Sequence, residues 1–320
     1  MKRNDVHGYS REGQRGRTLI ELLVAIALGL LILLGVGTLY LGASQSTRSM
    51  TGLASAEESG AVALRLIGNA IRRAGYAEII GTEDNNFREN LLYSGPLVRA
   101  CKGVAFDDIA AEDYDCGAAT DAPDILAVWF QADTALASPQ SPTEDCLGNA
   151  VGPVQVANPD YRARVPNIVV VRNIYQVDGN RLQCRGNGNA KFETLLEGVE
   201  DLKVYFGFDD LAFANPAAST ERPTARSIRS AEEIHAFADP SPTISRWDYV
   251  VSVHICVLVA TRETGVTAAA GQTYELCPQT ADQARGLEAV PTKPSADGRI
   301  RRAYTEVFTV RSRAAHTPAT

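Results

Sequence analysis

The sequence predicts an α+β protein in which one long N-terminal helix, half transmembrane and half amphipathic, packs on an antiparallel β-sheet head domain. Three observations support this. Residues 22–42 form an uncharged apolar run, residues 43–74 continue at helical spacing, and strand-like segments follow without helical segments of about 10–15 residues between them. The 320-residue chain is 45% hydrophobic and 22% charged, a globular composition that excludes collagen-like and wholly disordered chains.

The apolar run 22–42 has the length of a membrane span. It reads LLVAIALGLLILLGVGTLYLG, and a helix of about 20 such residues crosses the roughly 30 Å hydrocarbon core of a bilayer. A signal peptide usually has an apolar region of only about 7–15 residues. Basic residues concentrate before the run, which places the N-terminus in the cytoplasm and the rest of the chain across the membrane. They are Lys2, Arg3, Arg11, Arg15 and Arg17.

One carboxylate, Glu21, precedes this run directly. An ionisable group at such a position is costly unless it is paired, and this makes it a functional candidate. The simpler alternative is an interfacial Glu near the headgroups, stabilised by the helix dipole. The residues around it favour the functional interpretation.

The string from Arg15 to Leu23 reads RGRTLIELL. It resembles the class III signal of type IV pilins and type II secretion pseudopilins. The resemblance implies that a prepilin peptidase cuts after Gly16 and methylates the new N-terminus at Arg17, where the family usually has Phe or Met. Glu21 would then be the fifth mature residue, the assembly carboxylate that pairs with the processed amine of a neighbouring subunit.

The chain therefore divides into a cleaved leader (1–16), a long helix (17–75) with its transmembrane part at 22–42, and a β-rich head (76–320) with long loops. A break of the helix near 44–51 is the alternative, and Gly75 is a candidate C-cap. The apolar stripe of the second half is spaced three or four residues apart. Its members are Leu53, Ala56, Gly60, Leu64, Ile67, Ile71 and Ala74.

The head contains several strand-like segments. An Asp178-Gly179 turn predicts a hairpin between two of them. The Pro-, Ala-, Ser- and Thr-rich stretches 131–166, 209–243 and 264–298 are predicted surface loops. The segment from Leu196, LEGVEDLKVYF, and the R-S-R that ends the last strand resemble PilW-type minor pilins, with J-type minor pseudopilins as close relatives. Residues 195–207 are predicted to join a turn to an alternating strand. The other predicted strands are 125–130, 168–177, 180–184, 249–260 and 304–310.

Six cysteines lie beyond the span, where disulfides persist. Six cysteines allow 15 pairings, and neighbours along the chain suggest Cys101–Cys116, Cys146–Cys184 and Cys256–Cys277. Two alternatives are a free buried thiol at Cys256 and a zinc site, the latter disfavoured because the sequence has no C-x-x-C and no clustering of Cys with His. Two acidic groups are interpreted as solvated loops rather than Ca²⁺ sites. They are Asp107, Asp108, Glu112, Asp113 and Asp115, and the pair Asp209 and Asp210.

The sequence contains no G-x-S-x-G, H-E-x-x-H or Walker A motif, so we expect no enzyme, cofactor or metal. The net charge of -7 argues against nucleic acid as a partner. The resemblance implies a minor pilin of the initiation or tip complex of a type IV pilus, with twitching motility as its readout. Its partners would be prepilin peptidase, other minor pilins, the major pilin and the inner-membrane assembly platform, and its head would be periplasmic. The alternatives are a J-type type II secretion pseudopilin, a pilus-tip adhesin and, less favoured, an anchored enzyme.

Overall fold

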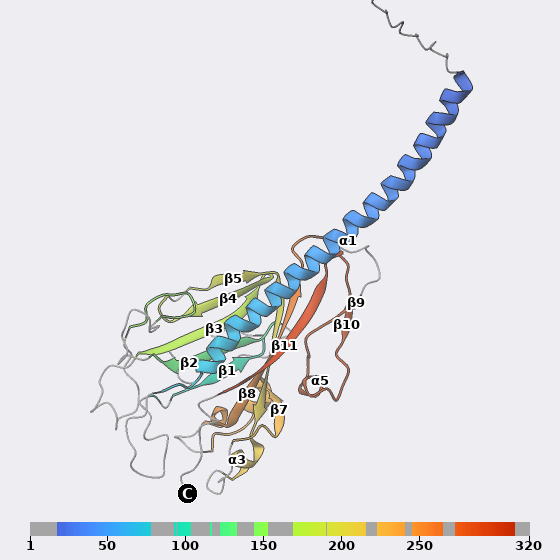
Figure 1. Ribbon diagram of the computed structural model, residues 1–320. Helices are drawn as coiled ribbons and strands as arrows, with labels where there is room; N and C mark the ends of the chain where they lie inside the picture. The colour runs from blue at the N-terminus through green and yellow to red at the C-terminus, as the bar shows by residue number, and fades with distance from the viewer. Residues whose placement is uncertain are drawn as a thin grey trace, which may run out of the picture. The chain divides into compact units, whose positions relative to one another are not determined.

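The computed structural model describes residues 18–77, 93, 95–103, 116, 122–132, 144–152, 169–189, 191–215, 223–240, 245–264 and 273–310. The chain divides into two compact units, Met1–Met50 and Thr51–Thr320. Helix α1 (Leu19–Arg73) contributes to both units (Figure 1).

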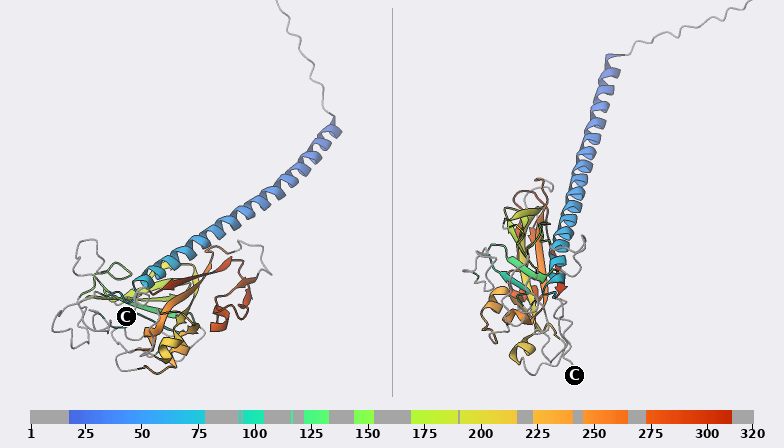
Figure 2. Two further views of the ribbon diagram at one scale, coloured as in Figure 1. Left: turned by 60° about the horizontal axis from the view of Figure 1, so that its bottom comes forward. Right: turned by 90° about the vertical axis from the view of Figure 1, so that its left-hand side faces the viewer.

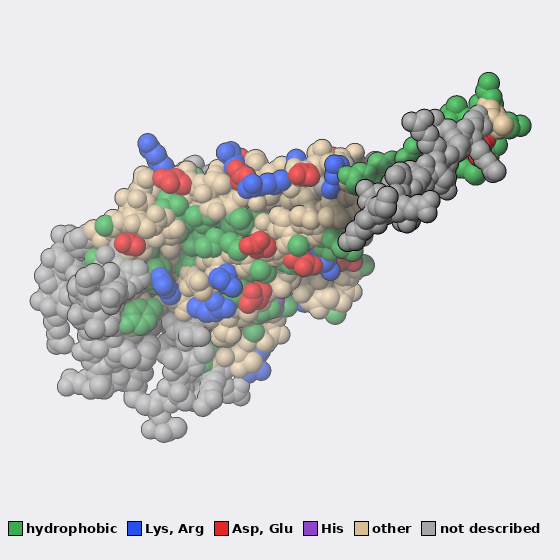
Figure 3. All heavy atoms as spheres, turned by 45° about the horizontal axis from the view of Figure 1, so that its top comes forward, with side chains coloured by type: hydrophobic (Ala, Val, Ile, Leu, Met, Phe, Trp, Pro, Cys, Tyr) green, Lys and Arg blue, Asp and Glu red, His purple; other side chains and the backbone are tan. Residues whose placement is uncertain are grey.

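The first unit contains the N-terminal part of α1. Every large apolar side chain from Leu19 to Leu41 is more than half exposed, and the helix is long and apolar enough to cross a membrane. Figure 3 shows the resulting apolar surface at the N-terminal end of the helix. Apolar side chains facing outward all round a helix are stable in lipid rather than in water.

The second unit contains two main β-sheets rather than the one that the sequence suggested. In both sheets every neighbouring pair of strands is antiparallel, so the predicted α+β class is confirmed. The first sheet has the order β1 (Val98–Cys101), β2 (Ile125–Gln131), β3 (Val170–Asp178), β4 (Arg181–Gly186), β5 (Glu193–Glu197). The second has the order β11 (Arg301–Thr309), β8 (Val250–Ala260), β6 (Val199–Phe208), β7 (Ser227–Ser230).

Two segments predicted as loops contain regular structure. Residues 209–243 include β7 and two short helices, and residues 264–298 include a two-stranded ribbon and a short helix. Each helix is only four or five residues long, too short for hydrophobic periodicity to reveal it. These elements are α3 (Asp210–Ala214), α4 (Ala231–His235), β9 (Thr273–Glu275), α5 (Ala281–Ala284) and β10 (Thr292–Pro294), and a 3₁₀ turn (Arg246–Tyr249) precedes β8.

The predicted hairpin is present, but its turn lies one residue later than expected. Asp178 pairs with Arg181 across β3 and β4, so Gly179 and Asn180 form the two-residue loop. Both have positive φ, 54° and 63°, as a type I′ turn requires. Asn tolerates this left-handed conformation better than most residues, so Asn180 can take the second loop position. Asp178 is then the last residue of β3 rather than a loop residue.

Gly198 carries the chain from the first sheet to the second, between β5 and β6. Its φ is +86°, and a Cβ at this position would lie 2.9 Å from the carbonyl oxygen of Ala260. Its amide donates to Asn180 O and its carbonyl accepts from Ala260 N, both at 2.8 Å. Only glycine fits this crossing without strain.

The C-terminal part of α1 covers the sheets and closes the main core (Figures 1 and 2). Two of its glycines receive aromatic rings from β11: a Cβ on Gly60 would lie 2.4 Å from the Tyr304 ring, and one on Gly68 would lie 2.2 Å from the Phe308 ring. Eight helical residues rise about 12 Å and four strand residues about 13 Å. The two glycine–ring contacts therefore have nearly the same spacing on helix and strand.

Candidate functional site: the start of α1 and the interior of the head

Glu21 lies in the first turn of α1, the N-terminal position that the sequence assigned to it. Its backbone N–H donates to Thr18 Oγ1 at 3.3 Å, and Leu22 N donates to Thr18 O at 3.2 Å. Thr18 is therefore the N-cap, and Glu21 stands at the third helical position, where Glu or Gln completes a capping box. Residue 21 thus stands at a position where a Glu or Gln side chain suits helix capping as well as any role in assembly.

The carboxylate of Glu21 has no ion pair among the residues that the structure describes, and its side chain is exposed. The predicted cleavage site, Gly16 and Arg17, lies outside the described residues, as does the acidic cluster 107–115. A carboxylate next to an exposed apolar helix favours a cationic partner once that helix is in lipid.

The head has three disulfides, Cys101–Cys116, Cys146–Cys184 and Cys256–Cys277. These are the pairs that neighbours along the chain suggest. Cys256 is therefore bonded rather than a free buried thiol.

The sequence did not reveal that His235 Nε2 lies 3.0 Å from Cys116 Sγ. His235 ends α4, 119 residues from Cys116, so no spacing rule could have found the contact. Cys and His do not cluster along the sequence, and folding alone brings this pair together. The other described histidine, His254, lies on β8, and burial holds its pKa below the usual value.

The pair Asp209 and Asp210 has a structural role. Asp209 caps α3 by accepting from Ala212 N at 3.2 Å, and its other carboxylate oxygen accepts from Thr224 N at 3.0 Å. Asp210 accepts from Arg229 Nε at 3.0 Å. Three of their four carboxylate oxygens thus accept from protein donors.

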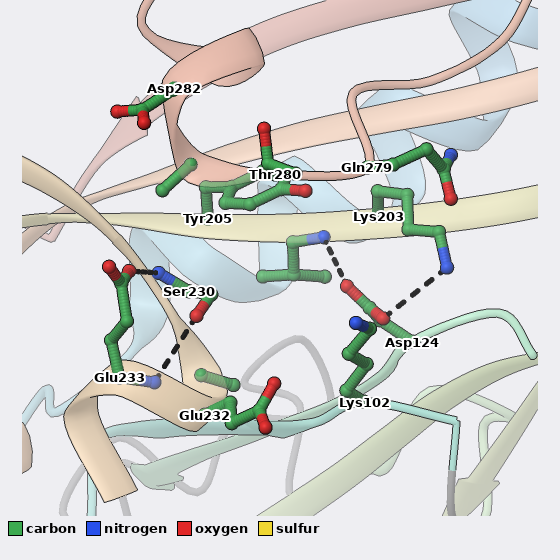
Figure 4. A pocket seen from close by; sticks show the side chains of 13 residues that line it. Lys102, Asp124, Lys203, Tyr205, Ser230, Glu232, Glu233, Gln279, Thr280 and Asp282 are labelled. Atoms are coloured by element: carbon green, nitrogen blue, oxygen red, sulfur yellow. Dashed lines mark hydrogen bonds and ion pairs between the residues drawn. The ribbon is translucent and has the colours of Figure 1, made fainter. Parts of the chain in front are cut away.

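A buried ion pair lies beside a cavity of about 290 Å³ between the two sheets and α4 (Figure 4). Lys203 Nζ on β6 lies 3.6 Å from Asp124 Oδ1 before β2, and it donates to Ala122 O at 3.0 Å. Asp124 Oδ2 accepts from Val204 N at 2.9 Å. Burial raises the pKa of Asp124 to about 6, although Lys203 opposes this rise. The pair joins the two sheets.

Charged side chains join α1 to β11 at the surface. Arg302 Nη1 lies 3.0 Å from Glu57 Oε1, and Arg72 Nη2 lies 3.8 Å from Glu306 Oε1. Arg72 also lies over the Phe308 ring, 5.2 Å from its centre. In Figure 3 acidic and basic side chains are interspersed over the visible face of the head. Exposed pairs of this kind each contribute about 0–1 kcal/mol, so the buried glycine–ring contacts dominate this interface.

Two family models match the chain. Residues 160–312 match the PilW family, described as type IV pilus-assembly protein W. Residues 11–37 match the prokaryotic N-terminal methylation motif, which includes Gly16, Arg17 and Glu21. No curated protein matches the chain.

Among solved structures, a type IV-like pilin from Thermus thermophilus matches with 13% sequence identity and a TM-score of 0.32, over 61% of this chain and 81% of that one. The PilW match covers most of the β-rich head after β2, and the methylation motif covers the start of α1. The two matches lie in the expected order along one chain. Over these residues the chain is similar to PilW-like type IV pilins.

Proposed function

We propose that the protein is a minor pilin of the initiation or tip complex of a type IV pilus. It is made as a prepilin, cut between Gly16 and Arg17 by prepilin peptidase and methylated at Arg17. Residues 22–42 hold it in the inner membrane with a cytoplasmic N-terminus and a periplasmic head, residues 76–320. Other minor pilins, the major pilin and the assembly platform are its partners. The role is structural, since a pilin acts by packing into a fibre.

The observation that carries this proposal is the PilW match over residues 160–312. Pilins and type II secretion pseudopilins share the methylation motif, so that motif alone does not separate them. The head match favours pilus assembly over secretion. A deletion strain tests this directly: we expect loss of twitching motility with exoprotein secretion intact, and the opposite pattern would identify a J-type pseudopilin instead.

The proposed mechanism of incorporation depends on Glu21. Cleavage leaves an α-amine beside an apolar helix, and the carboxylate of a neighbouring subunit neutralises it. A charge left unpaired in that environment costs several kcal/mol. Charge pairing thus sets the register between helices whose apolar contacts are otherwise non-directional.

Glu21→Gln separates this role from helix capping, because Gln also completes a capping box. We expect the variant to insert and to be cleaved normally, while its amount in sheared pili falls at least about tenfold, which corresponds to about 1.4 kcal/mol. Glu58→Ala is the matched control, since Glu58 is an exposed Glu on the same helix. Wild-type levels of the Glu21→Gln protein in pili would exclude the pairing role.

A further inference from the structure

A cluster of sulfur and imidazole donors lies where the end of β1 meets α4. It consists of Cys101, Cys116 and His235, whose ligand atoms all lie within 4.8 Å of one another. Cys101 is 2% exposed, while Cys116 and His235 are half-buried. Solvent therefore reaches the cluster from the side of Cys116 and His235.

We propose that reduction of the Cys101–Cys116 disulfide converts this cluster into a Zn²⁺ site with two thiolate ligands and one imidazole ligand. A dithiol reductant supplies two electrons and two protons, breaks the S–S bond and is itself oxidised to a disulfide. Zn²⁺ then displaces the two thiol protons and binds both sulfurs and His235 Nε2. The oxidised chain binds no metal here, because a disulfide offers no thiolate.

The geometry suits a tetrahedral zinc ion. Zn–S bonds of about 2.3 Å and Zn–N bonds of about 2.0–2.1 Å place the two sulfurs about 3.8 Å apart and each sulfur about 3.6 Å from the nitrogen. Cys116 Sγ and His235 Nε2 are already 3.0 Å apart, and the Cα atoms of Cys101 and Cys116 are 5.4 Å apart. After the S–S bond breaks, the two sulfurs can move apart, and Cys116 Sγ and His235 Nε2 need to separate by only about 0.6 Å to reach the S–N distance of a zinc site. The half-buried side leaves a fourth position for water.

The surroundings hold the imidazole in place. The ring of Trp247 meets the His235 ring edge-on, 5.3 Å between centres. Arg246 Nη1 donates to the His235 carbonyl at 2.6 Å. An imidazole fixed beside a thiol favours the thiolate, so His235 stabilises the reduced form of this disulfide.

The other two disulfides lack these features. Cys256 and Cys277 are both buried, at 3% and 0% exposed. Cys146 is half-buried like Cys116, but among the described residues it and Cys184 share no third ligand group such as His235. Within the described ranges, Cys101, Cys116 and His235 are the one group of three such donors close enough to share a metal ion. We therefore expect Cys101–Cys116 to be reduced before Cys146–Cys184 and Cys256–Cys277.

The full-length protein in detergent tests the proposal. Limited treatment with dithiothreitol, followed by alkylation and peptide mass spectrometry, shows which disulfide opens first. Zn²⁺ per chain is measured by elemental analysis after desalting, and Co²⁺ reports thiolate ligation through its charge-transfer absorption. The variants are Cys101→Ser/Cys116→Ser and His235→Gln, with His254→Gln as the matched control.

We expect one Zn²⁺ per reduced chain, none per oxidised chain and none in the double serine variant. His235→Gln should weaken binding at least about tenfold, and His254→Gln should leave it unchanged. Tryptophan fluorescence checks the fold, because reduction alone can loosen the head. Four results would overturn the proposal: no zinc on the reduced chain, unchanged affinity in His235→Gln, earlier opening of another disulfide, or a reduced head that stays unfolded in excess Zn²⁺.

Discussion

Replacing Gly68 by Ala places a methyl group where the Phe308 ring now lies. The added Cβ would approach Phe308 Cε1 to 2.2 Å, whereas ordinary contact begins near 3.4 Å. The ring or the helix must therefore move by about 1.2 Å. Phe308 is only 2% exposed, so the ring has little free space into which it can move.

Two effects of opposite sign set the magnitude of this change. Overpacking a close-packed core costs about 1–3 kcal/mol, and a 2.2 Å contact is expected at the upper end of this range. Ala gains about 1 kcal/mol over Gly in a helix interior. The net loss in the free energy of unfolding is therefore about 1–2 kcal/mol, which lowers Tm by roughly 2–8 °C for a domain of this size.

Denaturant unfolding of the full chain in detergent measures this loss. Both tryptophans of the chain, Trp129 and Trp247, are buried in the head, so their fluorescence reports on the head alone. Gly42→Ala is the control, because a Cβ there meets nothing within 4 Å. Adding Phe308→Leu to Gly68→Ala should cost less than the sum of the single changes. A midpoint for Gly68→Ala at or above that of the wild type would refute the glycine–ring packing.

Three further predictions follow from the buried pair, the disulfides and the leader. Because the pKa of Asp124 is about 6 in the folded head and near 3.8 ordinarily, the folded state binds more protons between these values, and stability falls as pH rises from about 4 to 6. Asp124→Asn should flatten this slope in melts from pH 4 to 7, and an unchanged slope would assign it to other groups. Cys146→Ala/Cys184→Ala should cost about 2–4 kcal/mol in denaturant unfolding, and a loss under 1 kcal/mol would contradict this. Intact-mass analysis of membrane-extracted protein should show loss of residues 1–16 and one methyl group on Arg17, whereas a chain still beginning at Met1 would contradict maturation.

Local sequence patterns were sufficient to predict the class of the fold and the position of Glu21 at the start of α1. An apolar run of membrane length and a stripe at helical spacing predict α1, because helix formation and membrane partition depend on neighbouring residues. Alternating or apolar runs found β2, β3, β6, β8 and β11 for the same reason. Glu21 lies in the first helical turn, as the leader pattern implies.

The division of the strands between two sheets was decided by tertiary structure. That division depends on backbone geometry at Gly198, where β5 and β6 are adjacent in sequence but pair with different partners. The short helices α3, α4 and α5 were missed because four or five residues carry no period. The loop of the β3–β4 hairpin consists of Gly179 and Asn180 rather than Asp178 and Gly179. Cross-strand register, rather than the Asp-Gly dipeptide, fixes which residues form the loop.

Contacts between distant segments also required the structure. Gly60 was predicted as a member of the apolar stripe and Gly68 was not, but only the position of β11 shows that each glycine receives an aromatic ring. His235 reads as an isolated histidine until α4 is placed beside Cys116. Sequence periodicity indicates which helix or strand a residue belongs to and which face of it the residue occupies. Close packing and shared ligand sites depend on residues that are distant in sequence and come together only on folding.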